Sequence, residues 1–311
     1  VGSIAGDKKF GFGDGIEATS PHAAAGQSVL VVRYNSSGAA KWAATVDSGT
    51  TSSSEFFGVA VDSKKSVYAV GRMLNGVVDF GNGKAVPEEG VGDIYRVLLV
   101  KYDLFGTTRW AKSVSPPVGK DSEYSGVAVD SSDVVSAVGY IEGDGSFNFG
   151  GSAASVKGKS TVTNSVIVSY SNSSGDARWG RSTVAAAAGS EFLDVATDAE
   201  NNSYAVGLIK GVDNFDFGSG VINGAFGGVN PVMVGYASDG SVKSAVTTVV
   251  APDSSRFRGA AVGLGVLPIA AGNVWGDGSF NLGNGVSVSG AFNDPLGVLD
   301  YNAVIASFPL E

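Results

Sequence analysis

The chain has 311 residues, a formal net charge of −9 and no cysteine. An acidic chain argues against nucleic acid as a partner, because binding a phosphate backbone requires clustered Lys and Arg. The lack of cysteine excludes disulfides, thiolate catalysis and cysteine-ligated zinc within the chain, and no apolar run reaches the roughly 18 residues that a membrane span needs.

One apolar phrase recurs five times at intervals of 66 to 71 residues. It reads VLVVRY, VLLVKY, VIVSY, VMVGY and AVIASF, beginning at Val29, Val97, Val166, Val232 and Ala303. Self-similarity at a fixed period indicates a repeat architecture. The repeat units span about 1–46, 55–114, 123–184, 191–249 and 256–308. Since nothing interrupts the series, we expect a single domain over 1–311.

In chain order, the first unit predicts three strands, the next three units predict four strands each, and the last unit predicts three. In the first complete unit these strands are expected at 56–61, 67–73, 97–102 and 109–114. Short turns and a Gly-rich insert separate them, with no helix for a parallel crossover, so we expect antiparallel meanders.

The faces of these strands define how the sheets must pack. The strand that begins at Val29 is apolar on both faces, and a strand of this kind must be covered on both sides. Four-stranded sheets stacked face to face around an axis supply that cover. The predicted fold is therefore an all-β β-propeller of five blades, with incomplete first and last blades.

The order of the repeated phrases resembles the bacterial SBBP-type β-propeller repeat family, which is found in exported and surface proteins. The best matches are GVAVDSKKSVYAVG at 58–71, its copy at 126–139, and the phrases at 29–46 and 97–114. The resemblance covers essentially the whole chain and implies an extracellular or bacterial cell-surface location, but hardly any specific function. The family is usually seven-bladed, whereas this chain has material for five. Towards its C-terminal end, Gly263, Ser244 and Leu282 replace the repeated aspartate, tryptophan and phenylalanine.

Repeated aromatic residues have two interpretations. We expect Trp42, Trp110 and Trp179, with the tyrosines that end the apolar phrase, to fill the space between blades, because large rings bury much area there. The alternative is a set of sugar-stacking platforms, one in each blade.

Repeated aspartates also have two interpretations. Asp62, Asp130 and Asp198 are expected to cap turns through their own backbone. The alternative is a calcium site shared with Asp133, Glu200 or Asn201. The D-x-D-x-D spacing is absent, so we expect no cofactor or metal. The only histidine, His22, leaves no second imidazole for a zinc site or a catalytic triad.

The candidate contact residues for a ligand or partner are Glu55, Glu123 and Glu191, with Arg256 in the fourth place. If the strand that follows them is innermost, they gather near the mouth of the central channel. Carboxylates brought close together perturb one another's pKa, an arrangement that ligands and cations exploit.

The favoured function is a non-enzymatic extracellular or cell-surface propeller, a binding or structural scaffold for protein or glycan contacts. A lectin-like carbohydrate-binding propeller is the near alternative. A five-bladed glycoside hydrolase using the channel-mouth carboxylates is a rival from another class. Homo-assembly through open blade edges is a further hypothesis, since an incomplete blade leaves an edge that accepts a strand.

Overall fold

A computed structural model describes residues 1–21, 26–50, 53–153, 155–263, 267–291 and 301–308. These residues form an all-β structure whose one helical element is a 3-10 turn at Gly151–Ala153. Accordingly, the described part contains no helix long and apolar enough to cross a membrane. His22 lies outside the described residues.

The described residues form five main antiparallel sheets, which follow one another in chain order. The first contains β1 (Gly2–Ala5), β4 (Gln27–Tyr34) and β5 (Ala40–Ala44). The second contains β7 (Ser54–Val61), β8 (Val67–Leu74), β11 (Tyr95–Tyr102) and β12 (Thr108–Lys112). The third contains β13 (Ser122–Val129), β14 (Val135–Glu142), β17 (Thr163–Tyr170) and β18 (Ala177–Ser182). The fourth contains β20 (Ser190–Thr197), β21 (Ser203–Lys210), β24 (Val229–Tyr236) and β25 (Val242–Thr247). The fifth contains β26 (Ser255–Val262), β27 (Pro268–Trp275) and β30 (Tyr301–Ser307).

Short strands form a hairpin within the Gly-rich insert of each unit. The hairpins are β2 (Lys9–Gly11) with β3 (Glu17–Thr19), β9 (Val78–Asp79) with β10 (Ala85–Val86), β15 (Ser146–Phe147) with β16 (Val156–Lys157), β22 (Asn214–Asp216) with β23 (Val221–Asn223), and β28 (Ser279–Asn281) with β29 (Ser287–Ser289). Two strands from the preceding unit, β6 (Ser48–Gly49) and β19 (Ala185–Ala186), pair with β9 and β22. The inserts of the second and fourth units are thus paired to strands of the units before them.

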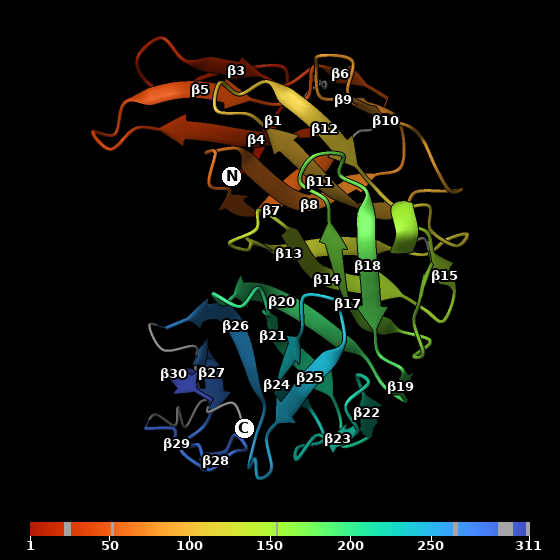
Figure 1. Ribbon diagram of the computed structural model, residues 1–311, viewed down its shortest axis with the longest axis vertical. Helices are drawn as coiled ribbons and strands as arrows, with labels where there is room; N and C mark the ends of the chain where they lie inside the picture. The colour runs from red at the N-terminus through yellow and green to blue at the C-terminus, as the bar shows by residue number, and fades with distance from the viewer. Residues whose placement is uncertain (22–25, 51–52, 154, 264–266, 292–300, 309–311) are drawn as a thin grey trace.

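The predicted antiparallel meanders, with three, four, four, four and three strands, are confirmed. The sheets follow a curved path from the first, red in Figure 1, to the last, blue, which lies towards the opposite end of the longest axis. Strands β7, β13, β20 and β26 pack each against the next along this path. Strands β12, β18 and β25 lie on its outer side (Figure 1).

The hydrophobic core is divided into four layers, one between each pair of consecutive sheets. Each layer combines residues of one sheet with residues of the next; for example, one layer contains Val31 and Val100, and the following layer contains Leu99 and Val168. This explains why the central strands are apolar on both faces.

The three repeated tryptophans are buried between sheets, as predicted. The indole N–H groups of Trp42, Trp110 and Trp179 donate to backbone carbonyls in the next sheet's outer turn, at 3.0, 3.0 and 2.9 Å. The accepting carbonyls belong to Leu104, Asn172 and Ser238. Each ring therefore fills a layer and fixes the neighbouring sheet.

Candidate functional site

The predicted contact residues occupy equivalent places in four sheets. Glu55, Glu123, Glu191 and Arg256 are each the second residue of a first strand, in β7, β13, β20 and β26. A bulge follows each of them, between Phe56 and Gly58 in β7 and at the matching places in the other strands. Hydrogen bonding between the first and second strands of each sheet fixes the backbone of these four residues.

Glycines on the second strands hold this geometry. Gly71, Gly139, Gly207 and Gly272 face the bulges, and a Cβ at any of them would lie 1.8 to 2.0 Å from the carbonyl oxygen of the contact residue opposite. No side chain fits at that distance, so only glycine permits this approach. These four glycines therefore allow the backbone of the contact residues to lie close against the second strand.

Arg72 on β8 links the first two glutamates across adjacent sheets. Its Nη1 lies 2.9 Å from Glu123 Oε2, and its Nη2 lies 3.5 Å from Glu55 Oε2. The guanidinium stands over the Tyr95 ring at 4.2 Å from the ring centre and 5.5 Å from that of Phe57. A cation placed over aromatic faces is attracted by their quadrupoles, so one arginine organises two carboxylates and two rings.

The other two contact residues have different partners. Glu191 accepts a hydrogen bond from Lys210 Nζ at 3.1 Å and one from Thr163 Oγ1 at 3.3 Å. Arg256 lies over the Trp275 ring at 4.9 Å from its centre, and Trp275 contacts Tyr301 with ring centres 4.8 Å apart. The three carboxylates thus lie near the beginnings of successive first strands, and each has a basic side chain as its partner.

Charge and burial shift the pKa values of this group. Burial raises the pKa of the Glu123 carboxyl, attraction to Arg72 opposes the rise, and repulsion from Glu191 and Glu55 adds to it. Burial likewise lowers the pKa of the Arg256 guanidinium, and the nearby Arg258 lowers it further. Burial also raises the pKa of the Tyr140 hydroxyl, and the adjacent Glu123 strengthens the effect. The groups interact electrostatically across three sheets.

Several members of this surface were not foreseen from the sequence. Arg72, Tyr140, Leu208 and Asn273 pair directly with the contact residues in the β ladders. Aligning VYAVGR, VSAVGY and SYAVGL places them at one position, directly after the repeated glycine. This alignment could have identified Arg72 and Tyr140 from the sequence as neighbours of the contact residues.

The repeated aspartates cap turns, as predicted. The Oδ1 atoms of Asp62, Asp130 and Asp198 each accept two backbone N–H groups, from residues two and four positions later. Asp62 also accepts the Tyr68 hydroxyl at 2.9 Å. Although burial acts to raise it, the pKa of the Asp62 carboxyl is lowered by hydrogen bonds from Ser66 and Tyr68 and by the nearby Lys101.

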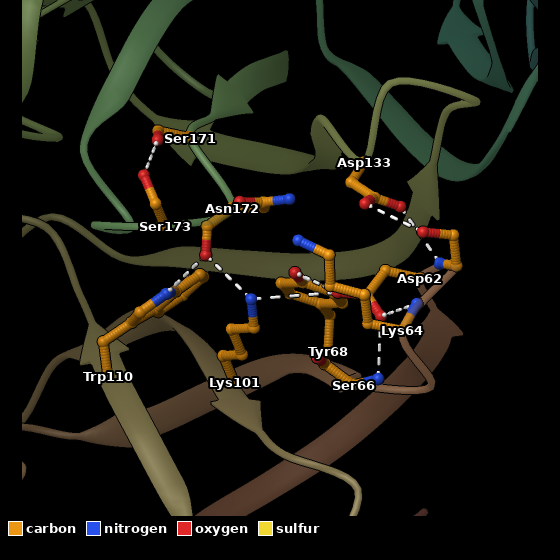
Figure 2. Close-up of polar contacts among 11 residues, drawn as sticks. Asp62, Lys64, Ser66, Tyr68, Lys101, Trp110, Asp133, Ser171, Asn172 and Ser173 are labelled. Carbon is orange, nitrogen blue, oxygen red and sulfur yellow. Dashed lines mark hydrogen bonds and ion pairs between the residues drawn. The ribbon is translucent and has the colours of Figure 1, made fainter.

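Figure 2 shows how this turn connects to the next sheet. Lys101 Nζ lies 3.8 Å from Asp62 Oδ2 and donates to the Asn172 carbonyl at 2.9 Å. The same carbonyl accepts the Trp110 indole N–H (Figure 2). Asp133, an oxygen donor in the alternative calcium site, accepts two hydrogen bonds from Ser63. Over the described ranges, no three acidic or histidine side chains gather where they could hold a metal ion.

Comparisons with known proteins add no family assignment. No protein-family model matches the chain, and no curated protein matches it significantly.

Proposed function

We propose that this chain is a β-propeller scaffold of five blades that acts outside the cell or on a bacterial cell surface, without catalysis, by contacting a protein or glycan. The curved succession of sheets, the packing of their first strands and the four inter-sheet core layers support a propeller of the SBBP-repeat kind. The first and last blades are then the three-stranded sheets.

The observation that carries the proposal is the charged and aromatic surface around Arg72. Arg72, Glu55 and Glu123 are each partly exposed, and Phe57 is exposed beside them. Arginine and aromatic residues are enriched at protein interfaces and supply most of their hot spots. Ion pairing and stacking hold the guanidinium in place before a partner arrives, which reduces the entropy lost on binding.

Binding to arrays tests this proposal. The labelled chain would be applied to a glycan array and to an array of extracellular proteins, alongside Arg72→Gln and Glu123→Gln. Lys112→Gln is the matched control, because Lys112 forms a comparable ion pair with Asp176 at 3.0 Å on the outer strand β12. We expect a binding loss of at least about tenfold in the Arg72 and Glu123 variants and none in the control. Wild-type binding by both site variants would reject this surface as the contact site.

A glycoside hydrolase would draw on the same carboxylates. The raised pKa of Glu123 suits a general acid, with Glu55 across Arg72 as the second carboxylate. Such an enzyme needs carboxyl groups about 5 to 9.5 Å apart. Hydrolysis of chromogenic aryl glycosides that is lost in Glu123→Gln and kept in Lys112→Gln would replace the scaffold proposal with this one.

Homo-assembly is proposed from the exposure of the two terminal sheets. Ile305 on β30 is 76% exposed, whereas residues at the same place in the other sheets are at most 3% exposed. Those residues are Val31, Leu99, Ile167 and Met233. On the first sheet, Tyr34 is 49% exposed, whereas Tyr102, Tyr170 and Tyr236 are at most 1% exposed. The sheet faces that adjacent sheets cover in the middle of the molecule are thus exposed on the first and last sheets.

A further inference from the structure

The fifth sheet reverses the charge found at the strand starts of the three sheets before it. Arg256 is the second residue of β26, a place that carries glutamate in the preceding first strands. Arg258 follows two residues later, at a place where those strands carry no charge. The aligned residues are Glu55, Glu123 and Glu191 at the first place and Phe57, Ser125 and Leu193 at the second.

Residues of β27 and β30 position these two arginines. Arg256 pairs with Asn273 in the β ladder, and Asn273 Oδ1 accepts a hydrogen bond from Arg258 Nε at 3.2 Å. The Arg256 guanidinium lies 4.9 Å from the centre of the Trp275 ring, which contacts the Tyr301 ring at 4.8 Å. Two guanidinium groups, one amide and two aromatic rings thus gather at one end of the fifth sheet.

Neither arginine has a carboxylate partner in the described part of the chain. Arg256 and Arg258 form no ion pair there, although the sequence has 30 acidic and 21 basic residues. The Nε of Arg256 and the Nδ2 of Asn273 are buried and have no acceptor among the same residues, and Asn273 is only 9% exposed. Because donors without acceptors cost free energy, the cluster favours a bound anion.

The surrounding charges favour an anion with a single negative charge. Burial lowers the pKa of the Arg256 guanidinium and Arg258 lowers it further, whereas Glu191 raises it. Glu191 is already paired with Lys210 at 3.1 Å. Since repulsion grows with charge, Glu191 opposes a dianion such as phosphate more strongly than a carboxylate. Guanidinium groups bind carboxylates through paired, charge-assisted hydrogen bonds.

An exposed aromatic ring adjoins the two cations. Tyr301 is 54% exposed and Trp275 is half-buried. A tyrosine side chain combines a broad apolar face with a hydroxyl group, and the C–H face and hydroxyl groups of a pyranose complement both. A ligand that carries a carboxylate on a pyranose ring can therefore contact the arginines and Tyr301 together.

We propose that this end of the fifth sheet binds a carboxylated sugar of the hexuronate class. The carboxylate pairs with Arg256 and Arg258, and the sugar ring lies against Tyr301. The choice of a sugar rests on the proposed function, which includes glycan contacts. The residues are separate from the charged surface around Arg72.

Calorimetric titration with glucuronate, glucose and acetate tests the site, at a chain concentration where light scattering shows the monomer. We expect saturable binding of one glucuronate per chain. Glucose lacks the carboxylate and acetate lacks the ring, so each should bind at least about tenfold more weakly. Acetate binding as tight as that of glucuronate would overturn the assignment to a sugar.

Substitutions locate the site. Arg256→Gln and Arg258→Gln should each weaken glucuronate binding by about tenfold, and Tyr301→Ala should weaken it while leaving acetate unchanged. Arg178→Gln is the matched control, because Arg178 is an exposed arginine on β18 without an ion pair among the described residues.

Arg72→Gln separates this proposal from the proposed function, because it should reduce binding on the arrays and leave glucuronate binding unchanged. Loss of glucuronate binding in Arg72→Gln would assign the sugar to the Arg72 surface and overturn the present site. The site is also rejected if the wild-type chain shows no saturable binding of glucuronate, or if the folded Arg256 and Arg258 variants bind as tightly as Arg178→Gln. If Arg256→Gln fails to fold, Arg258→Gln decides, since the Arg258 side chain is exposed.

Discussion

At the scale of single residues, Asp62 shows how a turn carboxylate acquires a longer-range role. It caps its own turn and also receives the Tyr68 hydroxyl, with its side chain fully buried. Because its folded pKa lies below the ordinary value of 3.8, it contributes stability that is present above that value and lost as the pH falls through the folded pKa.

Asp62→Asn should therefore destabilise the chain by about 1 to 3 kcal/mol at pH 7, with a smaller difference from wild type at pH 3. Urea unfolding at the two pH values measures both quantities. Asp130→Asn is the matched control, because Asp130 caps the same kind of turn and the residue aligned with Tyr68 is Ser136. Equal losses in the two variants at pH 7 would show that the tyrosine hydroxyl contributes nothing.

At the scale of strands, hydroxyl groups join each sheet to the next. The Ser54, Ser122 and Ser190 hydroxyls accept backbone N–H groups from the preceding sheet, at Val29, Val97 and Ser165, at 3.1, 3.1 and 2.9 Å. These serines begin β7, β13 and β20 and are completely buried. They connect first strands to sheets that lie earlier in the chain.

Ser122→Ala should cost about 1 to 3 kcal/mol, because the buried Val97 N–H loses its acceptor. Chemical unfolding at neutral pH measures the change. Ser125→Ala, a half-buried serine on the same strand, controls for strand propensity and should cost clearly less. A Ser122 variant as stable as the Ser125 variant would contradict a structural role for this bond.

These serines also explain what the sequence could and could not predict. Apolar periodicity located the strands, and the repeat located their order, because both depend on local pattern. The predicted strand at 56–61 missed Ser54 and Glu55, which are polar and read as a loop. These two residues belong to the strand because the Ser54 hydroxyl is hydrogen-bonded to the preceding sheet. A contact between residues far apart in the sequence cannot be predicted from the local pattern. Arg72 was missed for a related reason: its partner Glu123 lies 51 residues away.

At the scale of the whole molecule, the uncovered ends predict self-association. We expect light scattering after size-exclusion chromatography to show a mass that rises with concentration, because Ile305 and Tyr34 expose apolar area at opposite ends of the array. Ile305→Lys should reduce this rise. Phe105→Lys should not, although Phe105 is 79% exposed, because it lies in a turn rather than on a terminal face. Equal effects of both substitutions would indicate nonspecific hydrophobic association.

Ser244 on β25 stands where the first three units have a tryptophan, and this difference affects the order in which the sheets unfold. Where each repeat unit contacts only its neighbours, stability is approximately the sum of each unit's own stability and its coupling to those neighbours. Three couplings contain a tryptophan bonded to the next sheet and the fourth does not, so the fifth sheet should open first, as a separate cooperative unit. Native-state amide exchange would then show β26 and β27 exchanging at lower denaturant than β13 and β14. If all four strands shared a single opening free energy, this order would be contradicted. If β26 and β27 open at a lower free energy than β13 and β14, the C-terminal sheet unfolds separately from the rest of the molecule.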